Sequence, residues 1–399
     1  MTALALTACT GGGGEDVHAT MTVTPASALA DVPVSVTVTG LPAGARTTVT
    51  ATATDTSGVP WQSSADFRAG SDGKVSLAQK PLSGYPSADP MALFLLMTPT
   101  RSSAAFFAGG RTLDVTLRAS VDGKVVAQAV AHRRGPEDLG VRQRDLRPAT
   151  DGVYGTLFLP ADTSTRRPAL VVFGGSEGGV NTGPAAALLA ANGFPALALA
   201  YFKEPGLPTT LTDVPLEYFA RALRLLRTQP GVDPDHLLVQ GTSRGGEAAL
   251  LIGATYPELV HGVVAGVPSS RVGPTPNGST PAWTLHGRPL PPGQEIPVER
   301  IHGPVLMNCG EQDGVWPSCI FVDTVNFRLR QHHFRYPVTA LKYPDGGHFV
   351  GSFATSYVSW TPASLDLRSD GLTPGGTLQA TLAGAADSHA KLLALLRSL

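Results

Sequence analysis

Residues from about Val17 to Arg134 alternate between polar and apolar side chains with a period of two. The runs Val34–Val38 and Thr48–Ala53 show this most clearly, and the period places every second side chain on one face of a β-strand. Asp122-Gly123 separates two such runs, and this dipeptide favours the tight turn of a hairpin. The pattern predicts many short antiparallel strands in an immunoglobulin-like β-sandwich.

Beyond about residue 140 the pattern changes to apolar runs that alternate with helical spacing. Strands are expected at 169–173, 195–200, 237–240, 260–266, 305–309 and 338–343, and helices at 184–192, 216–227 and 387–399. This alternation predicts an α/β domain with a mostly parallel sheet and helices on both faces.

Two less regular segments complete the expected organisation. Gly135–Pro148 is charged and is expected to form an irregular link to a first strand pair near 153–159, and Pro268–Pro297 to form an irregular loop, either a cover over the substrate or a surface excursion. The expected division is residues 1–16 as a truncated lipoprotein signal and tether, 17–140 as the sandwich domain and 141–399 as the α/β domain.

The candidate chemistry begins at the end of the strand 237–240. It runs into Gly241-Thr242-Ser243-Arg244-Gly245-Gly246 and then an apolar helix, the strand, turn and helix of a nucleophile elbow. Small neighbours suit a serine held at an unfavourable backbone angle. A glycine-rich turn of any doubly wound domain is the alternative for this motif alone.

Two later residues complete a catalytic triad in the chain order of α/β-hydrolases. Asp313 follows the strand 305–309, with Glu311 as the second choice for the acid, and His348 follows the strand 338–343. Ser243, Asp313 and His348 are therefore predicted as nucleophile, acid and base. An Asx turn is the alternative role for Asp313, and His302, His332 and His333 are expected at the surface.

An oxyanion hole needs two backbone N–H groups near the nucleophile. The first is expected from Arg244 at the start of the helix, and the second from the glycine-rich loop Phe173–Gly179, with Gly175 and Ser176 as contributors. This loop lacks the lysine of a Walker motif, which speaks against a phosphate-binding role.

Composition narrows the classes of function. The 399 residues suit two domains, and 42% hydrophobic with 15% charged residues describe a globular chain. A net charge of −1 gives no basic surface for nucleic acid. No cofactor or metal is expected, since a triad and two amides suffice for acyl transfer, and the oligomeric state stays open.

The three cysteines bear on the compartment. Leu6-Thr7-Ala8-Cys9 resembles a bacterial lipoprotein processing site, so a lipid anchor at Cys9 and export to the membrane surface stand beside a cytoplasmic location. Cys309 and Cys319 bracket Asp313, and a disulfide between them would fit an exported protein, whereas two unpaired buried cysteines are the default expectation.

The whole chain from about residue 20 resembles the acyl-CoA thioesterase and bile acid-CoA:amino acid N-acyltransferase family. In the second domain the resemblance lies in Ala198–Phe202, Ala386–Leu399 and the triad positions. In the first it lies in these residues: Gly40-Leu41-Pro42, Asp55, Trp61-Gln62-Ser63, Phe67, Asp72-Gly73 and Asp89-Pro90-Met91.

The resemblance implies cleavage of an acyl-CoA-type thioester. It also implies hydrolysis rather than amino-acid transfer, because the family's transferases are associated with a cysteine nucleophile and this chain has Ser243. An exported carboxylesterase or lactone hydrolase, an acyl transferase to an amine, and a catalytically silent binding protein are the alternatives.

Overall fold

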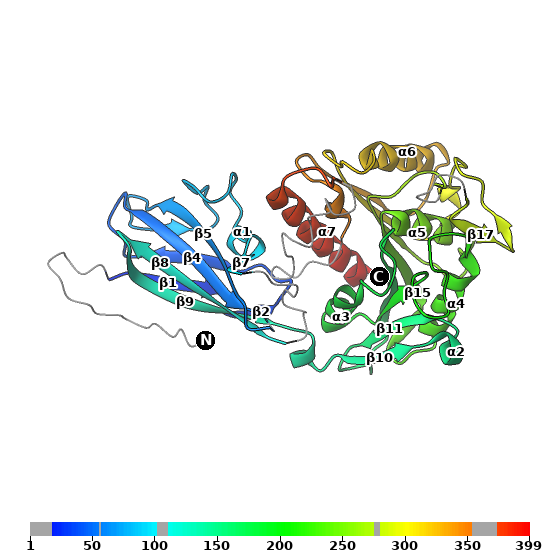
Figure 1. Ribbon diagram of the computed structural model, residues 1–399, viewed down its shortest axis with the longest axis horizontal. Coiled ribbons are helices and arrows are strands. Elements are labelled where there is room, and N and C mark those ends of the chain that lie inside the picture. Colours follow the sequence, from blue (N-terminus) through cyan, green and yellow to red (C-terminus); the bar gives the residue numbers. More distant parts are fainter. Residues whose placement is uncertain (1–17, 56, 102–110, 275–279, 353–372) are drawn as a thin grey trace. The chain divides into compact units, whose positions relative to one another are not determined.

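The computed structural model describes residues 18–55, 57–101, 111–274, 280–352 and 373–399. It divides into two compact units, one reaching Asp138 and the next beginning at Leu139 (Figure 1). The predicted signal and tether at residues 1–16 lie outside the described residues. Across the described ranges, none of the helices has the length and apolarity needed to cross a bilayer.

The first unit is built from two β-sheets. A six-stranded sheet has the order β2-β9-β8-β4-β5-β7, and a three-stranded sheet has the order β1-β3-β6. The bounds are β1 Thr20–Thr24, β2 Ser27–Leu29, β3 Ser35–Thr39, β4 Arg46–Thr54, β5 Pro60–Arg68, β6 Val75–Ser76, α1 Ala92–Leu95, β7 Thr98–Pro99, β8 Leu113–Val121, β9 Lys124–Arg134 and η1, a 3-10 helix, Glu137–Leu139. The immunoglobulin-like type of this unit stays a prediction.

The period-two pattern is visible in the burial of these strands. In β4, Val49 and Ala51 are fully buried while their neighbours are partly exposed. The predicted hairpin is confirmed, since Val121 pairs with Lys124 across Asp122 and Gly123. Both turn residues have positive φ, 49° and 77°, as a type I′ turn requires.

The second unit is an α/β domain around an eight-stranded sheet of order β10-β11-β13-β12-β15-β16-β19-β20. Only β10 and β11 run antiparallel to their neighbours, so the predicted mostly parallel sheet is confirmed. The bounds are β10 Arg142–Leu146, α2 Pro148–Asp151, β11 Tyr154–Leu159, β12 Arg167–Phe173, α3 Gly183–Ala191, β13 Ala196–Ala200, β14 Val214–Pro215, α4 Leu216–Arg227, β15 Val232–Thr242, α5 Arg244–Thr255, β16 Val263–Gly266, β17 Trp283–Leu285, β18 Arg288–Pro289, η2 Val298–Arg300, β19 Val305–Gly310, α6 Ser318–Gln331, β20 Val338–Tyr343, η3 His348–Gly351 and α7 Leu378–Ser398.

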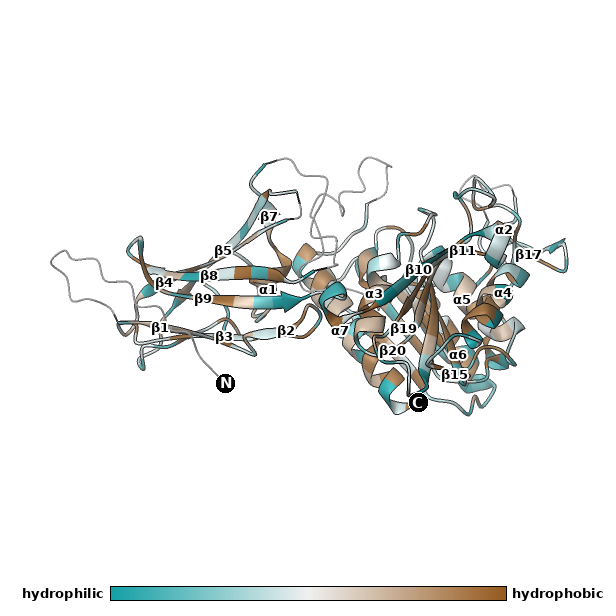
Figure 2. Ribbon diagram, turned by 90° about the horizontal axis from the view of Figure 1, so that it is seen from below, coloured by the Kyte–Doolittle hydropathy of each residue, from teal (hydrophilic) through white to brown (hydrophobic). Residues whose placement is uncertain are grey.

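Helices cover both faces of this sheet, as predicted (Figure 1). Along β12, Ala169, Val171 and Phe173 face a core shared with α4, α5 and α6. Leu170 and Val172 face the opposite core, which α3 and α7 complete. Figure 2 shows the resulting hydrophobic colour of the inner strands beside the hydrophilic edge strand β10.

Three local expectations are wrong. Arg142–Leu146 is not irregular but forms β10, because pairing with β11 supplies its backbone hydrogen bonds while four of its five side chains stay exposed. The segment 268–297 is not wholly irregular, since β17 and β18 join β14 in a small sheet. The C-terminal helix begins at Leu378 rather than 387, with Thr377 as its N-cap.

Candidate active site

The strand β15 delivers Ser243 to the edge of the sheet through a strained turn. Ser243 has φ 58° and ψ −119° and precedes the first residue of α5, which is the unfavourable geometry expected of an elbow. Its N–H donates to the Gly266 carbonyl at 2.8 Å. A Cβ at Gly241 would lie 2.0 Å from the Gly245 carbonyl oxygen, so the turn requires glycine here.

His348, the first residue of η3, reaches Ser243. Its Nε2 lies 3.0 Å from Ser243 Oγ, and its side chain is 8% exposed. Two hydrogen bonds hold the main chain around this pair. The His348 N–H donates to the Pro374 carbonyl at 2.7 Å, and Thr242 Oγ1 donates to the Gly351 carbonyl at 2.8 Å. The second contact joins the turn before Ser243 to the end of η3.

Asp313 supports the other side of the imidazole. Its two carboxylate oxygens lie 3.0 and 2.8 Å from His348 Nδ1, and its side chain is 1% exposed. The N–H groups of Val315 and Trp316 donate to the same carboxylate at 2.9 and 3.2 Å. Glu311 is exposed, so Asp313 is the acid that the structure brings to the histidine.

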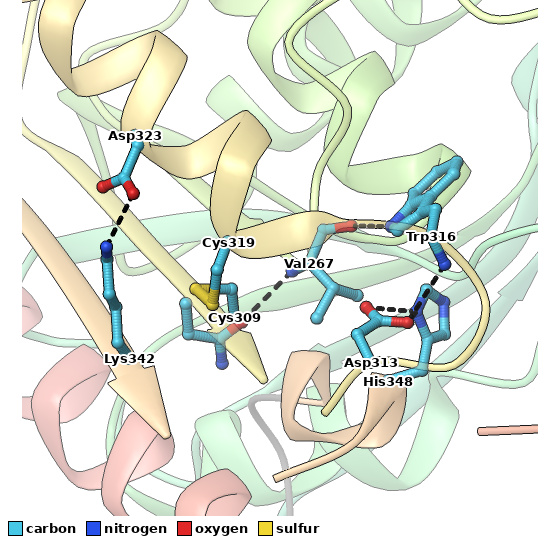
Figure 3. The surroundings of a disulfide bond; sticks show 9 residues. Val267, Cys309, Asp313, Trp316, Cys319, Asp323, Lys342 and His348 are labelled. Atoms are coloured by element: carbon cyan, nitrogen blue, oxygen red, sulfur yellow. Dashed lines mark hydrogen bonds and ion pairs between the residues drawn. A yellow bond between two sulfur atoms is a disulfide. The ribbon is translucent and has the colours of Figure 1, made fainter. Parts of the chain in front are cut away.

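Trp316 closes one side of this group of residues. Its ring stands edge-on to the His348 imidazole, with 5.7 Å between the centroids, and its Nε1 donates to the Val267 carbonyl at 3.0 Å. Figure 3 shows Trp316 above the Asp313–His348 pair. The tryptophan therefore fixes the loop that carries the acid as well as covering the imidazole.

The acid loop is also tied covalently. A disulfide joins Cys309, near the end of β19, to Cys319, the second residue of α6, with 5.1 Å between the Cα atoms (Figure 3). The default expectation of two unpaired cysteines is wrong. Spacing did not reveal the bond because the turn at 310–317, which brings α6 back against β19, is a tertiary feature.

The three residues expected to supply the oxyanion hole differ in how they lie relative to Ser243. Arg244 follows Ser243 directly and opens α5, where an N–H has no partner within the helix. Gly175 also lies against Ser243, because a Cβ placed on it would be 3.0 Å from Ser243 Cβ. Ser176 is exposed to solvent. The N–H of Gly175 donates to Glu177 Oε1 at 2.9 Å.

A buried tyrosine holds the main chain of this loop. The Tyr201 hydroxyl donates to the carbonyls of Gly174 and Gly175 at 3.0 and 2.7 Å, and full burial raises the pKa of this hydroxyl. Sequence reasoning did not assign Tyr201 a role. The signal in the sequence is its position: Tyr201 places a polar hydroxyl directly after the apolar strand Ala196–Ala200.

A cluster of buried polar groups lies at the start of α5. Arg244 Nη1 contacts Glu247 Oε2 at 2.5 Å, while Glu247 Oε1 accepts from the Gly273 N–H at 3.0 Å and from Trp283 Nε1 at 2.7 Å. Burial raises the pKa of the Glu247 carboxyl, and the Arg244 guanidinium opposes that rise. The cluster joins α5 to the segment 268–297.

Sequence reasoning also missed Asn308, a lone polar side chain in the apolar strand β19. Its Nδ2 donates to the Val350 carbonyl at 2.6 Å and to Ser388 Oγ at 2.7 Å. Its Oδ1 accepts from the Val267 N–H at 3.2 Å. Asn308 thereby links β19 to η3, which carries the histidine.

His302, His332 and His333 are exposed, as expected. Over the part of the chain that the structure describes, three or more metal-ligating side chains gather nowhere. The arrangement at Ser243 has the parts that acyl transfer requires: a hydroxyl, an imidazole within hydrogen-bond distance of it, a carboxylate that orients the imidazole, and backbone N–H groups nearby.

Comparison with known proteins identifies relatives of both units. Residues 31–147 match the profile described as the acyl-CoA thioester hydrolase/BAAT N-terminal region, and residues 214–274 and 285–387 match the BAAT/acyl-CoA thioester hydrolase C-terminal profile. Human acyl-coenzyme A thioesterase 1 is 30% identical over 74% of this chain and 77% of its own length. Mouse acyl-coenzyme A thioesterase 6 is 31% identical over the same shares.

Among solved structures, an esterase from Pyrobaculum calidifontis aligns with 64% of this chain and 85% of its own at 16% identity, with a TM-score of 0.44.

Proposed function

Because the chain belongs to the acyl-CoA thioester hydrolase/BAAT family, we propose that it is a serine-dependent hydrolase that cleaves acyl-coenzyme A thioesters. One observation supports assigning the reaction to three named residues. Ser243 Oγ, the imidazole of His348 and the carboxylate of Asp313 form one continuous hydrogen-bonded chain at the carboxyl ends of parallel strands, where α/β sheets place their ligands.

In the proposed first step, His348 Nε2 accepts the proton of Ser243 Oγ while that oxygen forms a bond to the acyl carbon. The N–H groups of Arg244 and Gly175 are the proposed donors to the oxygen that gains negative charge. The bond from the acyl carbon to sulfur then breaks, and the sulfur leaves as a thiol with the proton from His348.

In the second step, water attacks the Ser243 ester and gives a proton to His348. The bond to Oγ breaks, a carboxylic acid is released and the proton returns to Ser243. Asp313 is proposed to fix the Nδ1–H of the imidazole so that Nε2 faces the serine, and to stabilise the imidazolium.

The identity of the nucleophile favours hydrolysis over transfer to an amine. An acyl group on a cysteine is a thioester, which amines attack readily, whereas an acyl group on Ser243 is an oxygen ester, which activated water resolves. The proposed product is therefore a free carboxylate and a thiol.

The test is hydrolysis of a panel of acyl-CoA thioesters beside matched p-nitrophenyl esters. We expect turnover that favours the thioesters and that Ser243→Ala lowers by at least about a thousandfold. Ser398→Ala, an exposed serine at the end of α7, is the matched control and should keep full activity. Turnover that survives in Ser243→Ala would refute the proposed nucleophile.

A second candidate is an exported carboxylesterase that is anchored through lipid on Cys9. The observation that favours it is the Cys309–Cys319 disulfide, since such bonds persist mainly outside reducing compartments, where coenzyme A is scarce. Preference for simple esters in the same panel would select this candidate. Labelling of the chain by a fatty acid in bacterial cells, abolished by Cys9→Ser, would establish the anchor.

A further inference from the structure

Glu177 occupies a hydrogen-bond donor that the proposed reaction needs. Its Oε1 accepts from the N–H of Gly175 at 2.9 Å. A Cβ placed on Gly175 would lie 3.0 Å from Glu177 Oε2 and 3.0 Å from Ser243 Cβ. The carboxylate therefore stands beside the nucleophile, on one of the two N–H groups expected to bind the oxyanion.

The carboxylate is free to leave without a change in the loop. The Tyr201 hydroxyl holds the carbonyls of Gly174 and Gly175, and Lys203 Nζ donates to the main-chain carbonyl of Glu177 at 3.2 Å. The side chain of Glu177 is exposed, and its other partner is the Asn181 side-chain amide. The main chain is thus fixed, while the acid can rotate into solvent.

We infer that Glu177 is an internal competitor that keeps product carboxylates out of the oxyanion hole. The inference rests on the proposed function, in which each turnover releases a carboxylate. A carboxylate ion is a stronger acceptor than a neutral thioester carbonyl, because hydrogen bonds to charged groups are roughly twice as strong. An empty pair of N–H groups would consequently hold the product more tightly than the substrate.

A carboxylate already tethered at the site changes this balance. The product must displace an acceptor of its own kind whose local concentration is fixed by the chain, and a second negative charge nearby repels it. The oxyanion of the reaction is covalently held at the same place. The covalently held oxyanion can therefore displace the Glu177 carboxylate from the Gly175 N–H, whereas a free product carboxylate cannot.

The experiment measures inhibition of p-nitrophenyl butyrate hydrolysis by butyrate. Wild-type protein should be weakly inhibited, and Glu177→Ala should be inhibited at a butyrate concentration lower by about tenfold or more. Glu177→Gln, which keeps a neutral acceptor, should fall between them. A merely structural role of Glu177 in the loop would leave the inhibition constant for butyrate unchanged.

Glu204 supplies the matched control for charge. Its Oε1 lies 3.3 Å from where a Cβ of Gly179 would be, at the other end of the same loop, so Glu204→Gln removes one negative charge without touching Gly175. An equal rise in butyrate inhibition in Glu204→Gln, or no rise in either Glu177 variant, would overturn the inference.

A readout without substrate separates this inference from the proposed function. Butyrate should slow labelling of Ser243 by a fluorophosphonate more strongly in Glu177→Ala than in wild type. Protection of this kind together with no hydrolysis of any acyl substrate would refute the proposed function and would still show that Glu177 competes with a free carboxylate beside Ser243. Hydrolysis with equal protection in both proteins would do the reverse.

Discussion

Opening the Cys309–Cys319 bond is the perturbation whose cost the structure allows us to calculate. The bond joins residues 10 positions apart, and closing a loop of that length restricts the unfolded chain by about 2.7 kcal/mol in the chain-entropy model. For a domain of this size, each kcal/mol corresponds to about 2–4 °C in Tm. Reduction should therefore lower the Tm by roughly 5–11 °C.

Opening the disulfide should also lower the catalytic rate, because Asp313 lies in the segment between the two cysteines. A looser loop leaves the His348 imidazole less well oriented, so we expect kcat to fall severalfold while KM changes little. The assay is thermal unfolding and steady-state hydrolysis with and without reductant, together with the double variant Cys309→Ala, Cys319→Ala. Alanine is preferred to serine because Cys309 is fully buried and a hydroxyl would be left unpaired there.

Cys9→Ser is the control for reaction of the reductant elsewhere in the chain. Thiol counting must show that the bond has opened. If the bond is open and Tm moves by less than about 1 °C, the loop is held by its own hydrogen bonds, such as those from Val315 and Trp316 to Asp313, and the entropic reasoning is refuted.

Three further substitutions test positions that act through their neighbours. Tyr201→Phe removes both hydrogen bonds to the loop of Gly175 and should lower kcat about tenfold with KM nearly unchanged; steady-state kinetics with unchanged kcat would contradict a positioning role. Asn308→Ala removes the side-chain donor to the buried Val350 carbonyl, so urea unfolding should show a loss of about 1–3 kcal/mol; a loss below about 0.5 kcal/mol would show that water replaces the side chain. Asp66 in the first unit has its pKa lowered to about 2, mainly by hydrogen bonds from Thr48 and Arg46. Its stabilising effect is present above the unfolded pKa of about 4 and is lost as pH falls toward 2, so the stability difference between wild type and Asp66→Asn should shrink over that range and not stay constant.

The elements predictable from the sequence are those whose partners are close in the chain or whose pattern is periodic. The helix at 216–227 has the bounds predicted for it, because its apolar face repeats every three to four residues. The order of Ser243, Asp313 and His348 was readable because each follows an apolar strand, and parallel strands bring their carboxyl ends to one edge.

The features that sequence reasoning missed depend on partners remote in the chain. Strand β10 has four polar or charged residues before Leu146 and no apolar alternation, and only its pairing with β11 makes it a strand. From the sequence, Trp283 is an apolar residue in a loop. In the structure its indole N–H donates to Glu247, which lies 36 positions away in the chain. No local periodicity encodes such a contact.

The contact between Trp283 and Glu247 bears on how substrate choice and catalysis are connected. Glu247 lies one helical turn after Ser243, and its carboxylate contacts the side chain of Arg244, whose backbone N–H is a proposed oxyanion donor. The segment 268–297 is joined to that carboxylate through Gly273 and Trp283. Because a buried carboxylate left without its partners costs several kcal/mol, Gly273 and Trp283 cannot shift independently of the start of α5. A substitution that displaced Gly273 or Trp283 would consequently also disturb Arg244, the proposed oxyanion donor, so we expect steady-state kinetics to show a change in kcat together with KM.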